Sequence, residues 1–136
     1  MEQLRKDIKE VAGRAERKAD TIEVQHLLVA HAGAGIGGVT RSMDEAEKLA
    51  AELYAQIKGG ADFDALVKEH TDDAHPGIYG MTMSGSGDRG KNIYPRKGMV
   101  AAFGDVGWRL DVGEVGVAPY HDRNSPYGWH IIKRTK

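Results

Sequence analysis

The spacing of apolar positions changes along the chain, and each spacing predicts a different element. Residues 21–30 alternate between polar and apolar residues and then become continuously apolar, which predicts a central strand. The glycine-rich residues 32–38 follow. Ser42-Met-Asp-Glu45 then has the spacing of a capping box, in which serine and glutamate satisfy backbone donors at a helix start. The predicted helix carries apolar residues on one face and ends at Gly59-Gly60.

The second half of the chain predicts shorter elements. They are a helix from about Asp62, a short strand near 78–81 inside the loop-forming segment 71–97, a helix from Met99 to Leu110, and strands near 114–120 and 127–135. We therefore predict one α+β domain, with a small, mostly antiparallel sheet of four strands surrounded by helices.

Residues 1–20 are densely charged and are assigned separately from the domain predicted over residues 21–136. Leu4, Ile8, Val11 and Ala15 recur at helical spacing, which indicates a helix with only a thin apolar stripe. We interpret it as a solvated helical extension or connector. The alternative is a helix that docks on a partner or on a missing domain.

Composition narrows the function classes. The 136 residues include 19 basic and 20 acidic ones, so a formal charge of -1 offers no attraction to nucleic acid or to an anionic membrane. Without cysteine there is no disulfide, thiolate nucleophile or thiolate metal site. No apolar run is long enough to span a membrane. We expect a soluble monomer without membrane contact, cytoplasmic if the chain is complete and exported if it was cut from a longer parent.

Other chemical motifs are weak. Gly33-Ala-Gly-Ile-Gly-Gly38 has the glycine spacing of a dinucleotide site, but the capping box starts the helix later and no second parallel strand follows. The cluster between His70 and His75 lacks the ligand spacing of a metal enzyme, and no nucleophile elbow is present. We therefore expect neither a cofactor nor a metal.

Two histidines occupy apolar strand faces. His26 shares its face with Val24 and Leu28, and His130 shares its face with Ile132. A lone histidine in such a place is usually a hydrogen-bonded core residue, because both ring nitrogens need partners. Two of them could satisfy each other if their strands were neighbours.

Several further segments occur in the order of a known family. They are His26-Leu-Leu-Val, Asp44–Ala50, Ile57–Leu66, Thr71-Asp-Asp73, Gly77-Ile-Tyr-Gly80, Gly98–Phe103, Val112–Val115 and Gly128-Trp-His-Ile-Ile-Lys133. Together they resemble the parvulin-type (PpiC, or rotamase) peptidyl-prolyl cis-trans isomerases from about residue 21 to the C-terminus. The resemblance implies a parvulin-like fold and no cofactor.

The resemblance also implies site residues. His26 and His130 match the family's paired histidines, and Asp73 matches the Asp or Cys beside the substrate amide. Tyr79, Met99 and Phe103 match the proline pocket, and the spacing of Met99 and Phe103 would place both on one helix face. For the family's hydroxyl near the last strand, His121, Asp122 and Ser125 remain open. The segment 81–97 is longer than usual and could add a flap.

The expected activity is rotation of X-Pro peptide bonds in peptides or unfolded proteins, as a folding catalyst. The loop after the first strand is rich in Gly and Ala, with Arg41 only at its end, so a requirement for phosphorylated substrates is not expected. The alternative is a non-catalytic peptide-binding or chaperone module. The set His26, Asp73, Met99, Phe103 and His130 favours catalysis.

Overall fold

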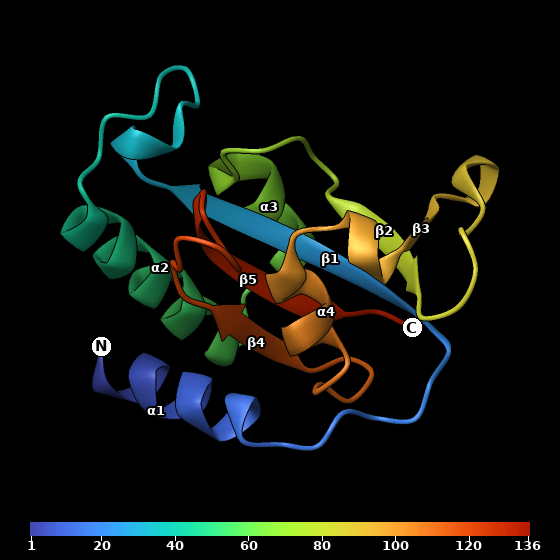
Figure 1. Ribbon diagram of the computed structural model, residues 1–136. Coiled ribbons are helices and arrows are strands. Elements are labelled where there is room, and N and C mark those ends of the chain that lie inside the picture. The colour runs from blue at the N-terminus through green and yellow to red at the C-terminus, as the bar shows by residue number, and fades with distance from the viewer.

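The computed structural model describes residues 1–136 as a mixed sheet covered by helices (Figure 1). Its helices and strands are α1 (Glu2–Ala12), β1 (Thr21–Ala30), α2 (Met43–Lys58), α3 (Phe63–His70), β2 (Ile78–Thr82), β3 (Ile93–Pro95), α4 (Ala101–Gly107), β4 (Val115–Ala118) and β5 (Gly128–Arg134). Short 3₁₀ turns occur at Ala32–Ala34, Arg89–Lys91 and Arg96–Gly98. No helix is long and apolar enough to cross a membrane.

The sheet has five strands in the order β3-β2-β1-β5-β4. All pairs are antiparallel except β2 with β3, which are parallel. The predicted α+β class is confirmed, but the predicted count of four strands is wrong. The missed strand β3 has only three residues, ends in proline and lies among turn-forming residues, so it shows no alternation of polar and apolar residues that would predict a strand.

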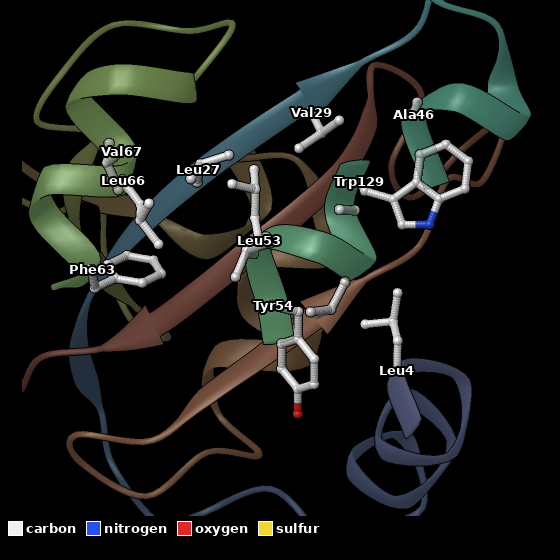
Figure 2. Close-up of a cluster of buried hydrophobic side chains, with 13 residues drawn as sticks. Leu4, Leu27, Val29, Ala46, Leu53, Tyr54, Phe63, Leu66, Val67 and Trp129 are labelled. Carbon is white, nitrogen blue, oxygen red and sulfur yellow. The ribbon is translucent and has the colours of Figure 1, made fainter. Parts of the chain in front are cut away.

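β1 is continuously apolar at its end because both of its faces are covered. Leu27 and Val29 belong to the cluster under α2 and α3, whereas Ile22 and Val24 belong to the cluster under α4. Figure 2 shows the first cluster, where Leu53 of α2 and Phe63 of α3 meet the sheet. One face of the central strand therefore packs under α2 and α3, and the other face packs under α4.

The start of α2 confirms the predicted capping box. The Ser42 hydroxyl accepts a hydrogen bond from the Glu45 amide at 3.1 Å, and the Glu45 carboxylate accepts one from the Ser42 amide at 2.9 Å. Both interactions satisfy amides that have no partner inside the helix. They fix the end of the loop that leaves β1.

The helix predicted from Met99 to Leu110 is shorter than expected. Met99 is extended, with φ -103° and ψ 161°, and α4 begins only at Ala101. The prediction that Met99 and Phe103 share a helix face is therefore wrong. The preceding residues form a 3₁₀ turn, closed by a 3.2 Å hydrogen bond from the Met99 amide to the Arg96 carbonyl.

The charged helix α1 is not solvated on all sides, which corrects our interpretation of residues 1–20. Leu4 is 2% exposed and Val11 is 6% exposed, and they enter the clusters on the two sides of the sheet. The Tyr54 hydroxyl of α2 also donates to Asp7 at 2.6 Å. The thin apolar stripe thus packs on the chain's own fold. The division at residue 20 stays a prediction.

Replacing Leu4 with alanine is expected to lower the free energy of unfolding by about 2–4 kcal/mol, the usual cost of a cavity at a buried leucine. Lys6→Ala is the matched control, because Lys6 is an exposed residue of the same helix. Urea denaturation followed by circular dichroism measures both. Equal, small effects would mean that α1 does not stabilise the fold.

Candidate active site

Strand pairing brings the two predicted histidines together. β1 pairs with β5 so that His26 lies opposite Ile132 and Leu28 lies opposite His130. Because side chains alternate, the two histidines share the face under α4 as diagonal neighbours. Their Nδ1 atoms are 3.2 Å apart, and the residues are 1% and 2% exposed.

An apolar wall lies against this histidine pair. The Phe103 ring meets His26 edge-on at 4.7 Å between centroids and His130 at 4.9 Å. Tyr79 lies 5.7 Å from His26 and stacks on Phe103 at 6.2 Å. Met99 is partly buried and packs against the cluster that contains Phe103. The structure thus brings Tyr79 and Phe103 together, and Met99, which lies outside α4, packs against the cluster to which Phe103 belongs.

Asp73 is the exposed member of the group. Its Oδ2 atom is 3.3 Å from His26 Nε2, and its side chain is 45% exposed. The two atoms are close enough for an electrostatic contact but are not aligned as a hydrogen bond. Asp73 therefore faces both the buried imidazole and solvent.

Backbone pairing with β1 positions Asp73. The Thr71 hydroxyl accepts hydrogen bonds from the amides of Leu28, at 3.1 Å, and Asp73, at 3.3 Å. On the other side, the His26 amide donates to the Gly77 carbonyl at 3.0 Å. Gly77 has φ +66°, and a Cβ there would lie 2.8 Å from the His26 carbonyl oxygen. Residues 71–77 thus lie closely along the strand that carries His26.

Burial keeps both imidazoles neutral. It lowers the pKa of His26, although the nearby Asp73 carboxylate partly offsets this effect. Burial, reinforced by His26, lowers the pKa of His130 to about 3. A neutral imidazole has one donor nitrogen and one acceptor nitrogen, so the two rings must share a single proton across their Nδ1 atoms.

The Asp73 carboxylate determines which of the two Nδ1 atoms carries the shared proton. A protonated His26 Nε2 facing Asp73 is favourable, whereas a lone pair facing it would be repelled. We therefore assign the proton between the rings to His130 Nδ1, which donates to His26 Nδ1. His130 Nε2 is then an acceptor, buried and without a protein partner. No group of three or more His, Asp or Glu side chains is arranged to hold a metal ion.

A family profile described as "PPIC-type PPIASE domain" matches residues 8–136. The chain belongs to this family. Foldase protein PrsA of Geobacillus kaustophilus is 40% identical over 89 residues, which are 65% of this chain and 27% of that protein. Chaperone SurA of Pseudomonas fluorescens is 29% identical over 121 residues, which are 89% of this chain and 24% of that protein. The chain thus spans a minor part of these relatives.

Solved structures give the same fold. The solution structure of TbPIN1 has a TM-score of 0.63 at 18% identity, covering 88% of this chain and 100% of that one. The peptidyl-prolyl isomerase ESS1 from Candida albicans has a TM-score of 0.60 at 17% identity, covering 99% of this chain and 74% of that one. At these identities the two structures show a shared parvulin-type fold.

None of the three residues considered for the parvulin hydroxyl is hydrogen-bonded to the histidine pair. Ser125 is 1% exposed, and its hydroxyl donates to the Gly128 carbonyl at 2.7 Å. His121 Nδ1 accepts from the amides of Arg123 and Asn124. The sequence left this position open, and the structure leaves His130 Nε2 without a hydroxyl partner.

Sequence reasoning also missed residues that support the parvulin site. Thr71 and Gly77 were quoted only as parts of family motifs, and no pattern signals that they bond to the backbone of β1. A hollow of about 430 Å³ between α1 and α4 is lined by Ala102 and Val106 and by two of the residues considered for the hydroxyl, His121 and Ser125, but by neither histidine of the pair, nor by Asp73 or the apolar wall. The hollow and the histidine pair therefore share no lining residue.

Acidification is expected to destabilise the protein between about pH 6.5 and pH 5 through this pair. In that window an unfolded histidine binds a proton, whereas His130, with a pKa lowered to about 3, stays neutral in the fold, and the lowered pKa of His26 disfavours its protonation. Their contribution is complete above the unfolded pKa and is lost as the pH falls towards the folded one. The slope is at most about 1.4 kcal/mol per pH unit for each histidine.

Urea denaturation at closely spaced pH values measures this slope. His130→Gln should reduce it, because the variant removes one of the two buried imidazoles. The carboxylates of Glu16 and Glu114 have a pKa below 4.5, so they contribute to acid unfolding at lower pH. A flat profile from pH 6.5 to 5 in the wild type would contradict a neutral pair.

Proposed function

We propose that this domain is an active peptidyl-prolyl cis-trans isomerase that rotates X-Pro bonds in peptides or unfolded proteins. The observation that carries the proposal is a neutral, buried histidine pair directly beneath an aromatic wall, with one carboxylate at its open side. A groove that only binds proline would need the wall alone. Membership of the PPIC-type family supports the same activity.

The reaction requires no covalent chemistry. Rotation about an X-Pro bond is opposed by a barrier of about 18–20 kcal/mol, because the twisted amide loses its conjugation. A site accelerates rotation when it binds the twisted amide better than either planar form. An apolar surface that excludes water helps, since the twisted amide no longer has the charge separation of the planar one.

We assign roles on this basis. Tyr79, Met99 and Phe103 grip the proline ring, so that the ring stays fixed while the preceding carbonyl turns. Asp73 lies at the open edge, and its carboxylate, 3.3 Å from the buried Nε2–H group of His26, forms an electrostatic environment for the rotating amide. His130 orients His26 through the shared proton and need not contact the substrate.

Substrate phosphorylation is not required in this proposal. Arg41 is the only arginine or lysine in the loop between β1 and α2. Its guanidinium group already contacts the Asp72 carboxylate and donates to the Ala30 carbonyl at 3.0 Å. A neutralised arginine is a poor phosphate clamp, which needs free, forked donors. Unphosphorylated X-Pro segments are therefore the proposed substrates.

A peptide-binding module without catalysis is the second candidate. It is favoured by the names of the relatives, a chaperone and a foldase, and by the small share of their length that this chain spans. In that case the same aromatic wall would hold proline-containing or unfolded segments without turning them. The clients of either function would be unfolded chains.

Exchange NMR on short Ala-Pro peptides separates the two candidates. We expect faster cis-trans exchange with catalytic amounts of the protein, and no gain when Ser-Pro is replaced by phosphoserine-Pro. A folded protein that binds the peptides but leaves exchange at the uncatalysed rate, across several X residues, would establish the binding module instead.

A further inference from the structure

The segment between β2 and α4 contributes a residue to the site that the family motifs do not include. We call residues 83–98 the flap. Within it, Tyr94 of β3 lies beside Met81 of β2 in the parallel pair. Paired residues point to the same side of a sheet, and Met81 is buried in the cluster under α4. Tyr94 therefore reaches the face that carries the site.

Tyr94 continues the aromatic wall. Its ring meets Tyr79 edge-on, with centroids 6.1 Å apart and planes at 65°. Tyr94 has no such ring contact with Phe103 or with either histidine, so it lies one ring further from the histidine pair. Both tyrosines are only partly buried, which leaves ring surface open to a ligand.

Close backbone contacts hold β3 in this place. The Gly80 amide donates to the Asn92 carbonyl at 2.9 Å, and the Asn92 side chain donates to the Ile78 carbonyl at 2.6 Å. A Cβ at Gly80 would lie 3.0 Å from the Ile93 side chain, and one at Gly87 would lie 2.5 Å from the Ile93 carbonyl oxygen. Gly80 thus permits the close approach of β3 to β2, and Gly87 permits the close approach of the preceding loop to β3.

Arg96 fixes the other end of the flap. Its guanidinium group donates to the Glu16 carboxylate at 2.6 and 3.0 Å and to Asp105 at 3.1 Å. It also lies over the Trp108 ring, 4.8 Å from the centroid. A Cβ at Gly104 would be 2.3 Å from Arg96 Nε, so the arginine crosses α4 at Gly104.

Glu16 belongs to the connection between α1 and β1, residues 13–20, which we call the strap. The strap is itself fixed, because the Trp108 indole donates to the Ala19 carbonyl at 2.8 Å and the Arg17 amide donates to the Trp108 carbonyl. Arg96 lowers the pKa of Glu16, which keeps that carboxylate charged at neutral pH. The strap therefore provides a charged anchor for the flap.

We propose that Tyr94 is a further substrate-binding residue, and that the Arg96–Glu16 pair positions it. Side chains two residues apart on one side of an extended peptide are separated by about 6.6 Å. The 6.1 Å between Tyr79 and Tyr94 matches that spacing. When the proline ring of the substrate lies against Tyr79, Tyr94 contacts an apolar side chain of the substrate two positions from that proline. This inference rests on the proposed proline pocket.

The test compares peptides with Leu or Gly two positions before or after the proline. For the preferred Leu peptide, Tyr94→Ala should raise KM about 5- to 10-fold with little change in kcat, the loss expected for part of a leucine's buried surface. Tyr94→Phe should keep the wild-type KM, because the ring provides the contact. For the matched Gly peptide, neither variant should change KM.

A separate variant and control test whether the Arg96–Glu16 pair positions Tyr94. Glu16→Gln should raise KM for the Leu peptide about two- to threefold and leave the Gly peptide unaffected, because a neutral partner only loosens the flap. Arg17→Gln removes another ion pair of the strap, with Asp111, and should change neither value. A rise with both peptides, or none with Tyr94→Ala, would overturn the inference.

Binding constants separate this inference from the proposed activity. If the wild type proves inactive, the same peptides and variants are compared by Kd from fluorescence titration. A Leu-specific loss of binding in Tyr94→Ala would then support the subsite although the isomerase proposal had failed. Equal Kd values for the Leu and Gly peptides in the wild type would overturn the subsite whatever the activity.

Discussion

Replacing Phe103 with alanine is expected to lower kcat/KM for X-Pro isomerisation by about 30-fold or more, the effect of losing a large apolar contact at the reacting group. The Phe103 ring is the one side chain that contacts both imidazoles and also stacks on Tyr79. Its removal opens the wall and admits water to the histidine pair. The opened wall would bind the proline ring less tightly, and the admitted water would replace the apolar surroundings of the amide.

The same substitution also threatens the fold. Phe103 is 5% exposed, and truncating such a residue costs about 3–5 kcal/mol of stability. Phe103→Leu keeps most of the volume and should retain the fold while still lowering kcat/KM. Val106→Ala is the matched control, since Val106 lies in the same helix but lines the hollow between α1 and α4, which Phe103 does not line. Its activity should stay at the wild-type level.

Exchange NMR gives the rates, and circular dichroism shows the folded fraction of each variant under the same conditions. If Phe103→Leu and Phe103→Ala are folded and turn over X-Pro peptides as fast as the wild type, Phe103 has no part in a proline pocket. Loss of activity in Val106→Ala as well would indicate a general effect of α4 rather than a specific contact.

The histidine pair illustrates what the sequence could predict. Alternation placed His26 and His130 on core-facing sides of two strands, which depends only on the period of a strand. Whether the strands are neighbours depends on pairing between residues more than a hundred positions apart. Local patterns carry no information about such pairing. The resemblance to the parvulins supplied that step, and the register of β1 with β5 now gives the geometry.

The errors come from contacts that periodicity does not encode. The helix before Phe103 is short because residues 96–98 form a 3₁₀ turn whose Arg96 lies across α4. α1 fully buries only Leu4 and Val11, with Ile8 partly buried, and most of its other residues are charged, so its stripe looks like that of a solvated helix. The turn is local but carries no periodic pattern, whereas the residues that bury α1 lie far away in the sequence.

The charges show the same limit. A net charge of -1 does not indicate any charged patch. Several ion pairs nevertheless lie where the strap contacts the rest of the fold. Arg14 donates to Glu114 at 2.7 Å, and Arg109 shares Glu16 with Arg96. Composition counts these charges without placing them. Their placement connects the N-terminal residues to the wall of the candidate site.

Replacing Gly128 with alanine is expected to cost more than about 3 kcal/mol of stability, because backbone strain and overpacking each contribute about 1–3 kcal/mol. Gly128 has φ +147°, and a Cβ there would lie 2.1 Å from the Val29 carbonyl oxygen. That oxygen belongs to β1, so the clash cannot be relieved by moving a flexible side chain. The two strands must separate where β5 begins.

Alanine variants of two other glycines distinguish the effect of backbone strain from that of overpacking. Gly113 has φ +90° with no atom within 4 Å of a Cβ, so Gly113→Ala reports the backbone strain alone, about 1–3 kcal/mol. Gly37 has neither a positive φ nor a neighbour, so Gly37→Ala should be nearly neutral. Urea denaturation of the three variants should give the order Gly128, Gly113, Gly37 from the largest loss to the smallest.

The position of Gly128 also ties this stability to function. His130 is two residues further along β5, and its proton reaches His26 only while the two strands keep their register. A Gly128→Ala variant that stays folded at low temperature should therefore lose isomerase activity as well, whereas Gly113→Ala should keep it. If Gly128→Ala costs no more stability than Gly113→Ala, β1 and β5 do not approach as closely as the histidine contact requires.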